Sequence, residues 1–144
     1  MSTFLFCLII ADFITGVAHW FEDTYGLPTW PLLGKEVIIP NIDHHKRPGV
    51  IGSMTTFISR NYLHGIPLAI ISLALYFWWW PAALTVIFAA MGNEVHAWTH
   101  QARPNWFVSL LQDMCIVQTP THHSKHHKPP YDRYFCTLTN LVNP

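Results

Sequence analysis

Residues 62–100 read "YLHGIPLAIISLALYFWWWPAALTVIFAAMGNEVHAWTH", and this stretch decides the fold class. Positions 65–92 contain no charged residue, a run longer than the roughly 20 apolar residues of one bilayer crossing. Pro81 suits the first turn of a helix and disrupts a helix interior. We therefore predict a membrane hairpin with helices over 62–79 and 81–100, whose turn tryptophans lie in the interface.

A third apolar segment, residues 2–18, reads "STFLFCLIIADFITGVA" and contains one acidic residue, Asp12. A signal peptide normally begins with basic residues, which this segment lacks. We interpret it as a first membrane helix, although its length is marginal for a crossing. A buried helix in a soluble protein is the alternative, both here and for the hairpin. Because a carboxylate is costly inside a membrane, Asp12 is expected to face the protein interior.

The composition agrees with a membrane protein and argues against other classes. Charged residues make up 11% of the chain, against roughly 25% in soluble domains. The net charge is zero and no basic stripe occurs, so no nucleic-acid partner is expected. Cys7, Cys115 and Cys136 are scattered, which argues against a disulfide framework or a thiolate zinc site.

Two further regions complete the predicted all-α membrane fold. The helical period of residues 106–118 indicates a short interfacial or core-docking helix. Residues 26–61 and 128–144 are rich in Pro, Gly and Asn, and are predicted to be ordered loops with short helices. The length of 144 residues suits one domain.

Threading three helices through a bilayer brings the histidines together. The first helix ends at His19, and the hairpin leaves at His64 and returns at His96 and His100. All ten histidines and all eight Lys and Arg residues then lie on one side. By the positive-inside rule that side is cytoplasmic.

The histidine spacing is typical of metal ligands. His96 and His100 are four residues apart on a predicted helix, so their rings share one face. The segment "THHSKHHKPP" (121–130) repeats this spacing if residues 121–128 form a helix that begins near Thr121 and ends at the prolines. Its histidines are His122, His123, His126 and His127. Such an arrangement suits two neighbouring metal ions better than one.

The number and type of these residues indicate the metal chemistry. Eight or more imidazoles are too many for one zinc ion, which takes three or four protein ligands. "HAWTH" lacks the glutamate of a metalloprotease HExxH, and the Glu-x-x-His motif of soluble di-iron bundles is absent. Affinity alone does not exclude zinc or copper. All-histidine ligation at a membrane face resembles the membrane desaturases and hydroxylases, whose HxxxH and HxxHH boxes match 96–100 and 123–127.

The sequence resembles one family in particular: the plasmanylethanolamine desaturases, bacterial carotenogenesis regulators and plant chloroplast fatty-acid desaturases of the lipid desaturase domain. The matching stretches are "AHWFEDTYG" (18–26), "DHHKRP" (43–48), "NEVHAWTH" (93–100) and "LLQDMCIVQTPTHHSKHHKPPYDRYFC" (110–136). By this resemblance, residues 1–144 form a single lipid desaturase domain that is shorter than typical members at both ends and at "WWWP".

The resemblance implies an O2-dependent di-iron lipid desaturase that introduces a double bond into an alkyl or acyl chain of a phospholipid. Conversion of plasmanylethanolamine to plasmenylethanolamine is the type reaction. The implied cofactors are two iron ions, with O2 as co-substrate and an external electron donor of the cytochrome b5 or ferredoxin type. The implied location is the bacterial inner membrane or the endoplasmic reticulum. We expect the lipid chain to lie in a cleft between the three helices, lined by Leu73, Phe77 and Phe88.

The family's histidines carry over to nine positions: His19, His44, His45, His96, His100, His122, His123, His126 and His127. His64 has no clear counterpart, and a metal ligand or a structural histidine are equal alternatives for it. Carboxylates are expected to orient the ligating imidazoles. The candidates are Asp23, Asp43, Glu94 and Asp113, each with a solvated charge or helix cap as its alternative.

Two other functions stay open at this point. A lipid hydroxylase begins with the same hydrogen abstraction, and only its product distinguishes it. A non-catalytic membrane metal-binding protein would load zinc or copper reversibly and consume no oxygen. Transport is disfavoured because it needs polar groups at mid-membrane, where only Asp12 is expected.

Overall fold

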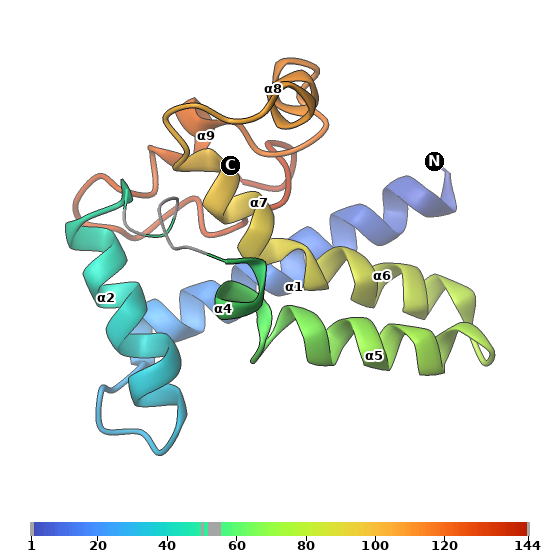
Figure 1. The fold of residues 1–144 in the computed structure, drawn as a ribbon, viewed down its shortest axis with the longest axis horizontal. Helices are drawn as coiled ribbons and strands as arrows, with labels where there is room; N and C mark the ends of the chain where they lie inside the picture. Colours follow the sequence, from blue (N-terminus) through green and yellow to red (C-terminus); the bar gives the residue numbers. More distant parts are fainter. Residues whose placement is uncertain (1, 50, 52–55, 144) are drawn as a thin grey trace.

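The computed structural model describes residues 2–49, 51 and 56–143, which form helices and turns with no strand among them (Figure 1). The elements are α1 (Thr3–Tyr25), the π-helix η1 (Gly34–Ile38), α2 (Ile39–Lys46), α4 (Phe57–Asn61), α5 (Gly65–Tyr76), α6 (Trp80–Ala90), α7 (Gly92–Thr99), α8 (Trp106–Asp113) and α9 (Pro120–His123). The α1, α5 and α6 helices extend toward one end of the molecule, and α2, α7 and α9 lie toward the other. The all-α prediction is confirmed for the described residues.

The first helix is longer than its apolar run. α1 has 23 residues and continues through the polar stretch after position 18. It begins at Ser2, whose side chain accepts a hydrogen bond from the Leu5 N–H, as N-cap serines do. It ends at Gly26, where any side chain would collide with the Glu22 carbonyl and with Ile38. Among the described residues, only α1 is long and apolar enough to cross a membrane.

The predicted hairpin forms, but its helices are shorter than expected. Pro81 lies in the first turn of α6 as predicted. The second helix breaks at Met91, whose N–H bonds to the Phe88 carbonyl three residues back, and α7 continues in a new direction. The 12 residues of α5 and the 11 of α6 extend only about 16–18 Å, against a hydrocarbon core of about 30 Å. The three predicted membrane crossings are therefore not confirmed.

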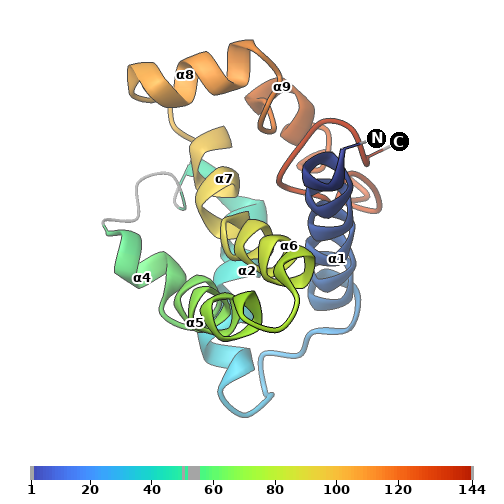
Figure 2. The same ribbon diagram turned by 90° about the vertical axis from the view of Figure 1, so that its right-hand side faces the viewer.

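α6 packs between α1 and α5 (Figure 2). The Ser72 hydroxyl of α5 donates a hydrogen bond to the Ala83 carbonyl of α6 at 2.8 Å. The Cys7 thiol of α1 donates to the Pro81 carbonyl at 3.4 Å. Small buried residues such as Ala11 and Ala83 allow this close packing. Large apolar side chains remain on the outer surface of the hairpin, including Leu73 (70% exposed) and Phe77 (87% exposed).

Residues 136–143, here called the C-terminal segment, pack against α1. Asp12 is fully buried and accepts hydrogen bonds from the N–H groups of Leu138 (2.8 Å) and Thr139 (3.0 Å) and from the Thr139 hydroxyl (2.6 Å). Its predicted inward orientation is confirmed. Gly16 allows the close approach, because a side chain there would collide with the Cys136 sulfur.

The helix predicted over 121–128 is only one turn long. It begins one residue earlier than expected, at Pro120, because the Thr119 hydroxyl caps it by accepting the His122 N–H. Beyond His123 the backbone tightens: the His126 N–H bonds to the His123 carbonyl, three residues back instead of four. The expected short helices appear elsewhere, with α8 inside 106–118 and η1, α2 and α4 inside 26–61, whereas the described residues 128–143 contain turns and no helix.

Candidate metal centre

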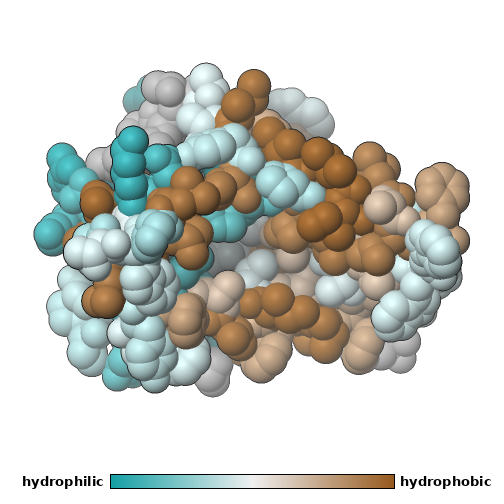
Figure 3. Space-filling model, turned by 90° about the horizontal axis from the view of Figure 1, so that it is seen from below, coloured by the Kyte–Doolittle hydropathy of each residue, from teal (hydrophilic) through white to brown (hydrophobic). Residues whose placement is uncertain are grey.

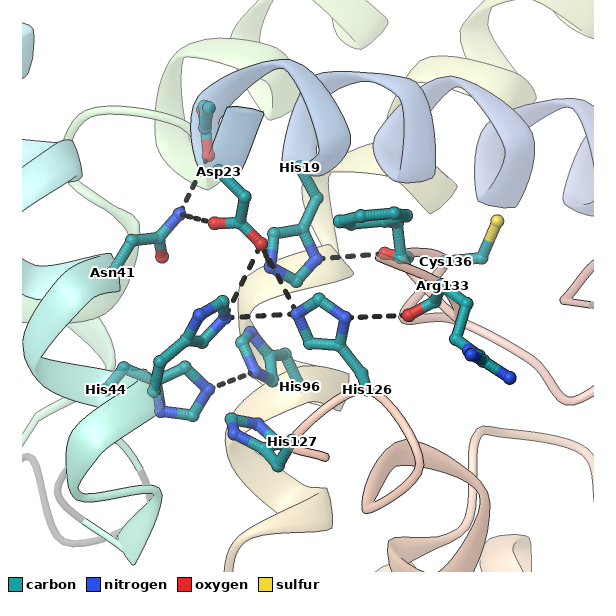
Figure 4. Close-up of polar contacts among 12 residues, drawn as sticks. His19, Asp23, Asn41, His44, His96, His126, His127, Arg133 and Cys136 are labelled. Atoms are coloured by element: carbon teal, nitrogen blue, oxygen red, sulfur yellow. Dashed lines mark hydrogen bonds and ion pairs between the residues drawn. The ribbon is translucent and has the colours of Figure 1, made fainter. Parts of the chain in front are cut away.

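Eight of the ten histidines meet in two adjoining groups where α1, α2, α7 and the turn after α9 converge. Figure 4 shows part of this region, including His19, His44, His96, His126 and His127. The five-histidine group consists of His44, His96, His100, His123 and His127. The aspartate group consists of His19, Asp23, His45 and His126. In each group the candidate donor atoms all lie within 4.8 Å of one another.

Local sequence divides neighbouring residues between the two groups. His44 and His45 are consecutive at the end of α2, and their rings point to different groups. The tightened turn after α9 does the same with His126 and His127. Because each group takes ligands from the same two segments, the groups must lie side by side.

The five-histidine group has the spacing of ligands around one ion. The Nε2 atoms of His44 and His96 are 2.9 Å apart, and those of His123 and His127 are 3.1 Å apart. Two nitrogens about 2.1 Å from a shared ion, at right angles, would be about 3.0 Å apart. Within the described residues, four buried ring nitrogens of this group have no hydrogen-bond partner: His44 Nδ1, His100 Nε2, His123 Nδ1 and His127 Nδ1.

The surroundings keep these imidazoles neutral. Burial, reinforced by neighbouring histidines, lowers the pKa of His44 to about 2, that of His127 to about 3 and that of His100 to about 4. The same causes hold the pKa values of His96 and His123 well below the usual range. Neutral imidazole is the form that binds a metal ion, so the group is prepared for ligation at neutral pH.

The aspartate group is built around one carboxylate oxygen. Asp23 Oδ2 lies 3.2 Å from His19 Nε2, 3.3 Å from His126 Nε2 and 3.4 Å from His45 Nε2. It is buried, yet none of these contacts is aligned as a hydrogen bond in the described structure. The other oxygen, Oδ1, accepts from the Asn41 side-chain amide at 3.3 Å. Three imidazoles and a carboxylate are a fitting donor set for a transition-metal ion.

Backbone carbonyls orient two imidazoles of the aspartate group. The Phe135 carbonyl lies 2.9 Å from His19 Nδ1, and the Arg133 carbonyl lies 2.9 Å from His126 Nδ1. An Nδ1–H donated to a carbonyl leaves Nε2 free to bind an ion. Tyr131 stacks on the His45 ring, with centroids 5.2 Å apart. Sequence reasoning missed these partners and looked for carboxylates instead.

The predicted orienting carboxylates take other positions. Asp23 stands among the imidazoles as a candidate ligand in its own right. Glu94 accepts hydrogen bonds from Arg60 at 2.8 and 2.9 Å and from Asn61 at 2.6 Å, and so joins α4 to α7. Asp43 forms an exposed ion pair with Arg47, and Asp113 is exposed at the end of α8.

Two of the predicted histidines lie outside both groups. The His122 ring faces the Tyr134 ring at 5.3 Å. The short α9 helix explains this, because the tightened turn removes the alignment expected between His122 and His126. His64 immediately precedes α5 and lines a cavity instead.

This cavity, of about 440 Å³, adjoins both groups. His19 of the aspartate group and His96 of the five-histidine group line it, with their ring centroids 5.7 Å apart. The apolar part lies between α1, α5 and α6 and is lined by residues such as Ile14, Leu68 and Val86. The polar part is lined by residues from 22–41, 59–64 and 93.

The predicted cleft between the three helices exists, but the residues named for it were wrong. Leu73 and Phe77 lie on the outer surface of α5 and the turn after it. Phe88 packs edge-on against Phe4, with ring centroids 4.9 Å apart. Viewed from below, hydrophobic residues gather at the hairpin end of the molecule and mostly hydrophilic residues at the α2 end (Figure 3).

Comparison with known proteins identifies the class of this fold and site. The family model of the lipid desaturase domain matches residues 8–144. The chain therefore belongs to the lipid desaturase domain family, as its motifs predict. No solved structure matches the chain.

Its relatives include a plasmanylethanolamine desaturase of Myxococcus xanthus, 34% identical over 99% of this chain and 54% of that protein. Plasmanylethanolamine desaturase 1 of Mus musculus is 32% identical over 94% of this chain and 55% of its own length. The chloroplastic fatty acid desaturase 4-like 2 of Arabidopsis thaliana is 32% identical over 94% of this chain and 50% of its own length. The chain spans about half the length of these curated relatives.

Proposed function

We propose that the chain carries the metal centre and the substrate cavity of a membrane lipid desaturase. The observation that carries this proposal is that one cavity, apolar at one end and polar at the other, is lined by a histidine from each ligand group, His19 and His96. A lipid has the same two-part chemistry. The aliphatic chain of the lipid can therefore lie against both ligand groups while its headgroup occupies the polar end of the cavity.

Two iron ions are the proposed cofactors, one in each group. Iron supplies the activation of O2 and the removal of hydrogen from unactivated carbon, which side chains alone do not perform. Membership of the desaturase family and the fit of both donor sets support this assignment. The five-histidine group offers neutral nitrogen ligands only, and the aspartate group adds one anionic oxygen.

The protein's own contribution is binding, orientation and exclusion of water. The cavity would hold two adjacent methylenes of the chain beside His19 and His96. The carbonyls of Phe135 and Arg133 keep the rings of His19 and His126 in fixed orientations. Desaturation removes two hydrogen atoms, that is, two protons and two electrons, from the lipid. An external donor of the cytochrome b5 or ferredoxin type supplies two more electrons, and with two protons O2 becomes two waters.

A membrane location follows from the distribution of apolar surface. α1 would cross the bilayer, and the α5–α6 hairpin would enter the same apolar layer without crossing it alone. Lipid would then cover exposed side chains such as Leu73, Phe77 and Trp78. The ligand groups would lie at the cytoplasmic face of a bacterial inner membrane or of the endoplasmic reticulum.

The test is expression in membranes supplied with an ether phospholipid, because two of the relatives are named for plasmanylethanolamine. Purified protein should contain two irons per chain, and lipid mass spectrometry should show the loss of two hydrogens with an acid-labile product. A gain of one oxygen would indicate a hydroxylase. Zinc in place of iron, with unchanged lipids, would reject the proposal.

A further inference from the structure

His64 has no place in either ligand group, yet it lines the same cavity as His19 and His96. It occupies the residue before α5 without forming a side-chain capping bond. In the described part of the chain its ring makes no hydrogen bond or ring contact. The imidazole is half-buried, faces the cavity and lies close enough to Glu22 for their charges to interact, and its ring nitrogens can hydrogen-bond to a molecule that enters the cavity.

Other polar side chains at this end of the cavity are already bonded within the protein. Tyr62 donates to Glu36, and the Asn93 amide donates to the Arg60 carbonyl at 2.9 Å. The Ser59 hydroxyl donates to the Thr56 carbonyl at 2.8 Å. By contrast, the His64 ring interacts with the nearby charge of Glu22 but makes no hydrogen bond among the described residues.

At the apolar end of the cavity, the polar residues Thr15 and Thr85 use their hydroxyls within the protein. The Thr15 hydroxyl donates to the Asp12 carbonyl at 3.0 Å, and the Thr85 hydroxyl donates to the Pro81 carbonyl at 2.9 Å. Both hydroxyls bond within their own helices, so both threonines are satisfied without a ligand. Together with Leu68 and Val86, they make a lining that suits an aliphatic chain.

The order of these residues along the helices gives the cavity a direction. On α1, Ile14 lies more than one turn before His19, and Glu22 lies almost one turn after it. On α5, His64 lies one turn, about 6 Å, before Leu68. His19 and His96 of the two ligand groups therefore lie between the apolar end of the cavity and His64 at its polar end.

We propose that His64 binds the substrate and not a metal: its imidazole donates a hydrogen bond to the phosphate of a phospholipid headgroup. One aliphatic chain of that lipid lies along Leu68 and Val86. Glu22 and Glu36 line the same polar end, so an anion alone would meet two carboxylates. A zwitterionic headgroup, which carries an ammonium as well as a phosphate, matches both charges. The assignment rests on the proposed desaturase function.

The experiment uses the iron-loaded chain in nanodiscs with three ether lipids that share the same chains. The lipids are an ethanolamine phospholipid, a glycerol phospholipid and an alkyl-acyl-glycerol without phosphate. His64→Ala should raise KM about tenfold for the two phospholipids, as expected for one hydrogen bond to a charged group. It should leave kcat, iron content and turnover of the phosphate-free lipid unchanged. His64→Gln, which keeps a donor, should restore part of the loss.

A second pair of variants tests the apolar end. Val86→Phe should lower turnover of all three lipids at least tenfold with full iron content, because it narrows the space for the chain. Leu73→Phe makes a similar enlargement on the exposed side of α5 and should leave turnover unchanged. Equal effects of the two substitutions would overturn the placement of the chain.

Three results would overturn the role of His64: loss of iron in His64→Ala, an unchanged KM for the phospholipids, or an equal loss with the phosphate-free lipid. Absence of product from the unmodified chain with every lipid would instead reject the desaturase function. In that case the phospholipid retained through purification, counted by mass spectrometry, still tests His64, because His64→Ala should retain several-fold less.

Discussion

The five-histidine group and the aspartate group differ in ligand charge and in how their rings are held. The first offers five neutral imidazoles; the second offers three imidazoles and the Asp23 carboxylate. In the second group, backbone carbonyls hold His19 and His126. In the first group, the Nδ1 atoms of His44, His123 and His127 are buried without partners among the described residues.

The two groups would therefore offer unlike surroundings to a bound ion. A carboxylate favours harder and more highly charged ions than imidazole does. Rings fixed at Nδ1 by a backbone carbonyl lose little freedom when an ion binds, whereas rings without a partner at Nδ1 gain more order from the ion. The aspartate group is therefore expected to form before its ion binds, and the five-histidine group to be completed by its ion.

The largest effect is expected for His123→Ala in the five-histidine group. His123 is fully buried. Its loss removes a candidate ligand from the group in which several ring nitrogens have no hydrogen-bond partner among the described residues. Desaturation should fall more than 100-fold, and the iron content should fall to about one ion per chain. Metal analysis and lipid mass spectrometry measure both. The adjacent His122 is the matched control: His122→Ala should keep both irons and most activity, and an equal loss there would place His122 among the ligands.

Asp23→Asn should selectively disturb the aspartate group. The amide has nearly the same shape but no charge, so the affinity for that ion should fall more than the roughly 10–100-fold typical of an outer partner. Metal titration should show one site weakened and the other retained. Asp43→Asn, at an exposed carboxylate two residues from His45, should change neither site. If both sites weakened equally in Asp23→Asn, the two groups would have to be treated as one unit.

A smaller effect is expected for Asp12→Asn, which loosens the C-terminal segment and not a ligand. Asp12 accepts three hydrogen bonds from that segment, so the stability should fall by about 2–3 kcal/mol. Ion affinity should fall mainly in the aspartate group, whose orienting carbonyls at 133 and 135 lead into the segment. Thermal unfolding and metal titration check this. Thr139→Val removes the hydroxyl's bond to Asp12 and the bond that it accepts from the Leu141 N–H, and should cost about 1–2 kcal/mol.

The smallest effect is expected for Tyr131→Leu, which removes the ring stacked on His45. Aromatic pairs contribute about 0.5–1.5 kcal/mol, so a loss of three- to tenfold in ion affinity is expected at the aspartate group only. Tyr131→Phe keeps the ring and should behave like the unmodified chain. A weakened five-histidine group in Tyr131→Leu would contradict the separation of the two groups.

Much of this site was predictable, because helical spacing is encoded locally. The i,i+4 pairs His96/His100 and His123/His127 each fall in one group, as their spacing predicts. The apolar runs located α1 and the hairpin. A signal for Asp23 was also present, since it follows His19 by four residues on the same helix.

The remainder depended on contacts that no local pattern encodes. The one-turn length of α9 separates His122 from the other histidines, and it arises from three-residue hydrogen bonds that the motif does not specify. The break at Met91 shortens the second hairpin helix in the same way. The orienting carbonyls of Arg133 and Phe135 carry no side-chain signature, because every residue has a carbonyl.

The anchorage of the C-terminal segment on Asp12 has a consequence for the order of biosynthesis. The hydrogen bond between Asp12 and the Thr139 N–H joins positions 127 residues apart. A ribosome synthesises His19 and Asp23 before their partners His126 and the Phe135 carbonyl. During that interval α1 carries an unmatched acid in its apolar stretch. The two candidate groups can therefore be completed only when residues 119–143 fold back onto α1.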